Sequence, residues 1–217
     1  MRPRLWLDSG PMSSKILVIF LFGLSFDAGA APCSSVRTVP IRLLNEAAVP
    51  PTVLTAAQQE AVYILKSLCV HLEWTAESVS DAMEMRTTPA PVGPGVTKGS
   101  LGITFLDQSG TNRGTVFFSR VFAVERTYGR LVSLERLLGC VLAHEIGHLL
   151  LGTKAHSRGG IMVANFDQAE LLKAGQRRLL FTRDDREMFF THQVGRVSIP
   201  TPMYCSGRNS REHCRKS

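Results

Sequence analysis

Two histidines and a glutamate stand at a spacing that can hold a metal ion beside a carboxylate. They are His144, Glu145 and His148, in the run His-Glu-Ile-Gly-His. On a helix, side chains four residues apart share a face, so both imidazoles can direct a nitrogen at one zinc ion about 2 Å away. Glu145 projects roughly 100° around the axis, where it can take a proton from water that the metal activates. The spacing therefore predicts zinc-dependent hydrolysis, with Glu145 as the general base.

A catalytic zinc site needs a third protein ligand. We expect His156, because it follows His148 by eight residues and a turn at Gly152 can bring the chain back beneath the helix end. Asp167 and Glu170 remain alternatives, since later acidic residues can also bind zinc. The other histidines that we weighed are expected at the surface rather than on a metal: His71, His192 and His213.

A chance occurrence of this motif is rare. With 6 histidines in 217 residues, a random His-Glu-x-x-His is expected on the order of once in a hundred such chains. The surrounding residues are apolar, and three polar side chains on a buried helix are costly unless they have a role. A polar cluster satisfied by hydrogen bonds alone is the less favoured interpretation.

The segment from His144 to Met162 resembles the metzincin zinc-peptidase site, especially that of the matrix metalloproteinases. The metzincin motif is His-Glu-x-x-His-x-x-Gly-x-x-His, followed by a turn with a methionine beneath the metal. The matching positions are His144, His148 and His156 for the ligands, Glu145 for the base, Gly152 for the turn glycine and Met162 for the Met-turn.

The spacing departs from that motif. Gly152 comes one residue late and His156 two residues late, whereas Met162 comes early. No tyrosine stands just after Met162, where the sequence is Val-Ala-Asn-Phe. The resemblance therefore implies a bacterial, exported branch of metzincin-like zinc peptidases, outside the ordinary matrix metalloproteinases.

The motif lies in a helix whose two ends carry local signals. Ser133 is a plausible N-cap, and Glu135 suits the first turn because of the helix dipole. Apolar residues recur as far as Leu151, and Gly152 can end the helix with a positive φ. The sequence thus predicts a buried helix from 133 to 151.

Strand and helix signals alternate on both sides of this helix. Residues 89–100 contain three prolines and three glycines, so we expect a loop there. Predicted strands cover 39–44, 70–74, 82–87, 101–106 and 115–118, and predicted helices cover 52–68, 119–128 (capped by Ser119), 167–175 and 182–193 (capped by Thr182).

The resemblance implies an α+β zincin-like fold. It comprises a twisted mixed sheet of about four or five strands, the active-site helix and a C-terminal helix. In such folds one antiparallel edge strand lines the cleft, and residues 101–106 fit that position. An extended peptide could then bind by pairing with this strand.

The N-terminus has the features of an export signal. Basic residues precede an apolar run from 16 to 24, and small residues follow at 28–31. We expect a signal peptide over 1–31, a metallopeptidase domain over 32–200 and a basic, cysteine-containing tail over 201–217. The mature protein is expected to be secreted or periplasmic and to lack a membrane span, with an uncleaved anchor as the alternative.

The chain has 5 cysteines, which an exported protein can join as disulfides. Cys140 falls inside the site helix and is expected to be a buried free thiol. Cys33, Cys69, Cys205 and Cys214 can form two bridges in any of three pairings. Cys33 could instead cap the metal as an inhibitory thiolate.

Three functions remain open from the sequence. The first is a zinc endopeptidase with a peptide or protein substrate; the second is a non-catalytic zinc-binding or protein-interaction domain; the third is a zinc amidohydrolase acting on a non-peptide amide. Glu145 favours the first over the second, because a structural zinc has no use for an adjacent carboxylate and needs a fourth protein ligand.

The net charge of +7 is modest and no nucleic-acid motif accompanies it, so a nucleic-acid partner is not expected.

Overall fold

The computed structural model describes residues 33, 36–77, 82–106 and 112–196. The predicted signal peptide and C-terminal tail, with Cys205, Cys214 and His213, lie outside the described residues. The elements are β1 (Arg37–Asn45), α1 (Pro51–Leu65), the 3-10 turn η1 (Lys66–Leu68), β2 (Val70–Thr75), β3 (Met83–Thr88), β4 (Gly102–Phe105), β5 (Arg113–Phe117), α2 (Phe118–Tyr128), α3 (Leu134–Leu151), α4 (Gln168–Gly175) and α5 (Arg183–Arg196).

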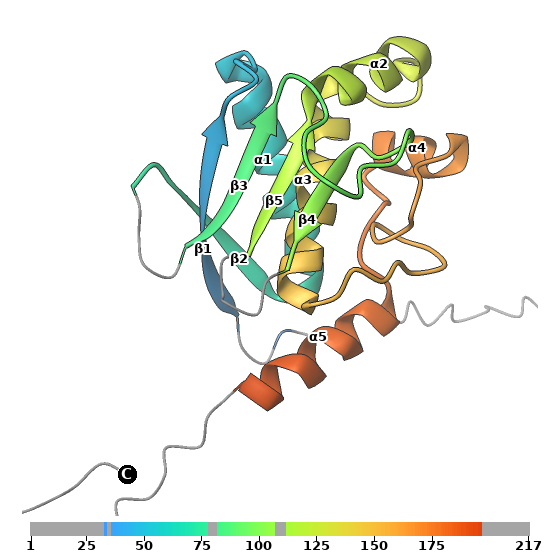
Figure 1. Ribbon diagram of the computed structural model, residues 1–217. Coiled ribbons are helices and arrows are strands. Elements are labelled where there is room, and N and C mark those ends of the chain that lie inside the picture. Colours follow the sequence, from blue (N-terminus) through green and yellow to red (C-terminus); the bar gives the residue numbers. More distant parts are fainter. Residues whose placement is uncertain (1–32, 34–35, 78–81, 107–111, 197–217) are drawn as a thin grey trace, which may run out of the picture. The chain divides into compact units, whose positions relative to one another are not determined.

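The strands form one twisted, mixed five-stranded sheet in the order β2-β1-β3-β5-β4 (Figure 1). Four strands are parallel, and β4 alone runs antiparallel, at the edge beside β5. The prediction of an α+β fold with a mixed sheet of four or five strands is confirmed. Strand β4 is the antiparallel edge strand that was expected at residues 101–106.

Helices α1 and α3 pack against each other and cover one face of the sheet (Figure 1). Alternate strand side chains, such as Ile41 and Met85, point into this layer and are fully buried. From the helix side, Ile64, Leu142 and Ile146 fill the same core. This packing fixes α3, and therefore the histidine motif, against the strands next to the edge.

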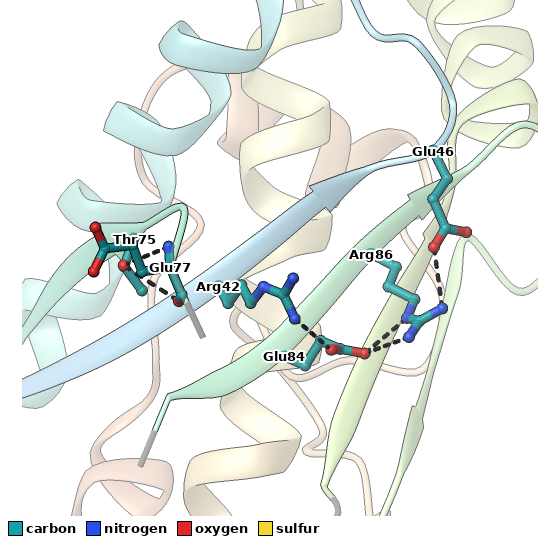
Figure 2. A network of polar contacts seen from close by, with 6 residues as sticks. All are labelled: Arg42, Glu46, Thr75, Glu77, Glu84 and Arg86. Carbon is teal, nitrogen blue, oxygen red and sulfur yellow. Dashed lines mark hydrogen bonds and ion pairs between the residues drawn. The ribbon is translucent and has the colours of Figure 1, made fainter. Parts of the chain in front are cut away.

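The opposite face of the sheet carries a polar network on β1 and β3 (Figure 2). Glu84 accepts from Arg86 Nε at 2.8 Å and lies 3.7 Å from Arg42 Nη1, and Arg86 also reaches Glu46 at 3.0 Å. These side chains are 26% to 45% exposed, so each ion pair contributes at most about 1 kcal/mol. The network marks a solvated face, opposite the helices.

The predicted start of helix α2 was wrong, and the last turn of the helix predicted over 52–68 is 3-10 in type. Helix α2 starts at Phe118, with Phe117 as N-cap and no side-chain cap, so Ser119 lies inside the helix instead of capping it. The reason is that β5 runs directly into α2, leaving no loop residue to cap it. The helix expected over 52–68 ends as α-helix at Leu65 and continues as η1, which closes at Cys69 with a left-handed φ of 58°.

A disulfide joins Cys33 to Cys69. This bond selects one partner for Cys33 among the pairings that the sequence left open, and it excludes Cys33 as an inhibitory thiolate because its sulfur is already bonded. Cys140 is a buried free thiol, as expected. None of the helices in the described ranges combines the length and the apolar character needed to cross a membrane.

Candidate metal centre and cleft

Helix α3 presents the histidine motif from the middle of the core. It begins after Ser133, whose backbone is extended, and every residue from Leu137 to Leu151 is buried. It ends at Gly152, where φ is +63° and the amide donates to His148 O at 3.0 Å. That left-handed conformation suits glycine because a Cβ would be strained there. The predicted helix and its terminator are confirmed.

The imidazoles of His144 and His148 point one nitrogen each at a common position. Their Nε2 atoms are 3.1 Å apart. His144 Nδ1 lies 2.7 Å from Ile161 O, and His148 Nδ1 lies 2.8 Å from Thr153 O. A carbonyl oxygen can only accept, so each Nδ1 carries the proton and each Nε2 presents a lone pair. Tetrahedral zinc with nitrogens about 2.0–2.1 Å away separates two ligands by about 3.3 Å, so this donor pair fits a metal.

His156 joins this pair from the segment after α3. Its ring centroid lies 5.4 Å from that of His144 and 5.0 Å from that of His148. One ligand atom from each of the three residues falls within 4.8 Å of the others. Within the part of the chain that the structure describes, this cluster comprises the three histidines alone. Three protein ligands leave one coordination position for water or substrate, as catalytic zinc requires.

The two alternative third ligands serve α4 instead. The Asp167 side chain caps this helix, accepting from Ala169 N at 2.7 Å and Glu170 N at 3.2 Å. Glu170 forms an ion pair with Lys173 at 3.1 Å. Neither carboxylate belongs to the histidine cluster. The lone His71 is exposed, and His192 is half-buried against Gly152.

Burial keeps the histidine cluster uncharged in the metal-free protein. Burial, together with the neighbouring His148, lowers the pKa of His144 to about 3. Burial also lowers the pKa of His148 and that of His156. Neutral imidazoles are the form that binds metal, so the cluster does not have to lose protons near neutral pH before a metal binds.

A clasp between Ser157 and Asp185 holds the segment that carries His156. Ser157 Oγ donates to Asp185 Oδ1, and Ser157 N donates to Met162 O at 2.8 Å. Asp185 is 1% exposed and also accepts from the Thr182 amide at 2.8 Å. Thr182 and Asp185 thus form the predicted helix cap. No sequence pattern predicts this clasp, because the capping signal indicates where α5 starts but not what Asp185 contacts 28 residues away.

Met162 packs against the inner side of α3. It is 1% exposed, and a Cβ added to Gly147 would lie 2.5 Å from its sulfur. Because Gly147 lacks a side chain, the methionine sits directly against the helix turn between Glu145 and His148. The structure thus places the residue predicted for the Met-turn against the site helix.

Glu145 is buried beside the cluster and bonded to the edge strand. It is 4% exposed, and Thr104 Oγ1 donates to its Oε2 at 2.6 Å. Burial raises the pKa of Glu145 to about 7, and the Thr104 hydrogen bond opposes that rise. A carboxyl with a pKa near neutrality can both accept and release a proton. Thr104 was not among the predicted site residues, since it lies 41 residues from Glu145 and carries no local signal of this contact.

The site opens into a cleft of about 770 Å³. One wall is residues 101–105 with loop residues Pro94, Gly95, Thr97, Gly99 and Ser100. The other walls are α3 with His144, Glu145 and His148, then His156 from the segment after α3, and residues 163–166 after Met162. Phe117 N donates to Leu101 O at 2.8 Å. Hydrogen-bonded pairs alternate in an antiparallel ladder, so the backbone groups of Gly102 and Thr104 point away from β5. The free edge of β4 therefore offers peptide groups along the cleft.

Known proteins that resemble this chain are found among solved structures. No protein-family model matches the chain, and no curated protein matches it. Among solved structures, archaemetzincin from Methanopyrus kandleri is 13% identical with a TM-score of 0.48, over 76% of this chain and 99% of that chain. A chain of the GM1-bound ECX AB5 holotoxin is 16% identical with a TM-score of 0.38, over 70% of this chain and 80% of that chain. At these values neither likeness bears on the chemistry of the site.

Proposed function

We propose that this protein is an exported, zinc-dependent endopeptidase in which Glu145 is the general base. The observation that carries this proposal is the convergence of three imidazoles beside a buried carboxyl, in a cleft lined by β4, which pairs with β5 alone among the described strands. A structural zinc site requires neither the carboxyl nor the cleft.

Each group of the site has a role in this reaction. His144, His148 and His156 would hold a zinc ion, which would serve as a Lewis acid for the scissile carbonyl and would lower the pKa of a bound water. Glu145 accepts the proton of the attacking water and delivers it to the leaving amine. The Nδ1 bonds to Ile161 O and Thr153 O keep two of the imidazoles oriented and in the required tautomer.

The strand edge favours a peptide over a small amide as the substrate. An extended peptide can pair with the outward backbone groups of Gly102 and Thr104, which brings a peptide carbonyl alongside α3. A small non-peptide amide would use only a fraction of a cleft of about 770 Å³. A substrate paired along this strand edge would present an internal peptide bond to the site, which favours an endopeptidase.

The disulfide supports the export part of the proposal. The bond between Cys33 and Cys69 persists in oxidising compartments and is rare in the cytosol. Together with the N-terminal signal pattern, it favours a secreted or periplasmic protein. The mature N-terminus of exported material, determined by sequencing, should lie close to residue 32; an N-terminus at Met1 or Met12 would contradict signal cleavage.

A peptide library tests the activity. The wild type should cleave internal peptide bonds, detected by mass spectrometry as new termini. A chelator should abolish the activity and stoichiometric zinc should restore it. Glu145→Gln should lower kcat by about 10²- to 10⁴-fold with zinc retained. Zinc binding without any cleavage would favour a non-catalytic domain, and cleavage limited to non-peptide amides would favour an amidohydrolase.

A further inference from the structure

Thr104 connects the edge strand to the carboxyl beside the metal cluster. Its hydroxyl donates to Glu145 Oε2 at 2.6 Å and lies 3.2 Å from the backbone oxygen of the same residue. Thr104 is 4% exposed, so both ends of this contact are shielded from water. A hydrogen bond to a charged group is stronger in such surroundings than at the surface.

Gly102, two residues earlier on the same face of β4, leaves space for the other carboxyl oxygen. A Cβ at this position would lie 2.5 Å from Glu145 Oε1 and 2.8 Å from the backbone oxygen of Thr115. Real Cβ atoms do not approach so closely, so any larger residue would displace the carboxyl or the strand. Thr104 thus binds one oxygen of the Glu145 carboxyl, and Gly102 leaves space for the other oxygen.

We propose that Thr104 is a positioning residue for Glu145, holding Oε2 so that Oε1, beside Gly102, is the oxygen that exchanges the proton. The inference rests on the proposed function. It assigns β4 a second task besides binding substrate, because the strand that pairs with the peptide also sets the orientation of the base. General-base catalysis depends on a correct geometry before it depends on pKa.

The test compares Thr104→Val, which removes the hydroxyl at nearly constant shape, with Thr104→Ser, which keeps it. Thr104→Val should lower kcat by about 10-fold or more, with KM changed less than about 2-fold and zinc content unchanged. Thr104→Ser should restore most of kcat. Thr87→Val is the matched control. It removes a buried hydroxyl on β3 that donates to Asn45 Oδ1 at 2.9 Å, and it should leave kcat unchanged.

A second readout does not depend on activity. In the metal-free protein, Thr104→Val should lower the thermal unfolding midpoint by about 3 °C or more when Glu145 is present, and by clearly less when Glu145 is replaced by alanine. Gly102→Ala should also lower kcat, by steric displacement of the carboxyl, while zinc remains bound.

The outcomes separate this inference from the proposed function. An active wild type whose Thr104→Val variant keeps full kcat, or equal midpoint shifts in the two Glu145 backgrounds, would overturn the positioning role alone. A wild type that binds zinc but cleaves no peptide would overturn the endopeptidase function, and the role of Thr104 in catalysis with it.

Discussion

The Glu145 carboxyl lies in surroundings that disfavour its charge. Its folded pKa of about 7 stands above the ordinary value of 4.5, chiefly because of burial. Folding therefore takes up a proton between these two values, and the stabilising contribution of the protonated carboxyl is fully present below about pH 4.5 and is lost as the pH rises through 7. The charged form of Glu145 therefore lowers the free energy of unfolding of the metal-free protein at alkaline pH.

Glu145→Gln should remove this pH-dependent loss of stability, because glutamine stays neutral at every pH and can still accept a hydrogen bond from Thr104. In the metal-free protein, the free energy of unfolding of the variant relative to the wild type should rise by about 2 kcal/mol between pH 5 and pH 8. Urea unfolding of both proteins at the two pH values measures this difference. A difference independent of pH would mean that the carboxyl titrates at its ordinary pKa.

The clasp of Ser157 and Asp185 should matter for metal affinity, since Ser157 follows His156 directly. Removing the hydroxyl by Ser157→Ala frees the segment that carries the third histidine, and the zinc dissociation constant should increase by about 10-fold or more. Competition with a chromogenic chelator measures it. Ser67→Ala is the control: it removes a hydroxyl that bonds Ile64 O at 2.7 Å outside the cleft, and affinity should stay unchanged. Equal affinities for wild type and Ser157→Ala would show that His156 needs no such support.

At the scale of elements, the loop before β4 forms one wall of the cleft, and α2 holds it in place. Arg120 Nη1 donates to Thr97 O at 2.7 Å and to Ser100 O at 2.6 Å. The guanidinium carbon also lies 5.6 Å from the ring centroid of Phe117. One side chain of α2 therefore fixes the shape of a loop that lines the cleft.

Arg120→Gln should loosen this wall without touching the metal or the base. KM for peptides should rise by about 5- to 10-fold, the equivalent of about 1 kcal/mol or one hydrogen bond of ordinary strength, while kcat stays within about 2-fold. Steady-state kinetics on a cleaved library peptide tests this split. Arg126→Gln on the same helix, where the side chain is exposed, should have no effect. A fall in kcat with constant KM would assign Arg120 to the chemistry instead.

Local signals predicted these elements better than they predicted the contacts between them. Helix α3 begins and ends where the signals at Ser133 and Gly152 predicted, because such signals act within a few residues, although the Ser133 side chain makes no capping hydrogen bond. The cap at Ser119 was wrong because Phe117 in β5 leads directly into α2. The contact of Thr104 with Glu145 spans 41 residues, and no pattern within either segment encodes it. The fold and the histidine motif were therefore predictable, and the groups that orient them were not.

At the scale of the whole molecule, the disulfide ties the start of the described chain to the end of η1. It joins cysteines 36 residues apart, and closing a loop of that length in the unfolded chain stabilises the fold by about 3 to 4 kcal/mol. Cys33→Ser should lower the free energy of unfolding by about this amount. Zinc content should stay the same, since neither Cys33 nor Cys69 lines the cleft. A wild type whose stability does not change on reduction would contradict the contribution of this bond.

The most direct test of the central claim is zinc content and peptide hydrolysis, measured on the same samples of wild type, Glu145→Gln and His156→Ala. The account predicts one zinc per chain and cleavage for the wild type, one zinc without cleavage for Glu145→Gln, and loss of both for His156→Ala. A wild type that binds no zinc, or a Glu145→Gln variant that cleaves as fast as the wild type, would contradict it.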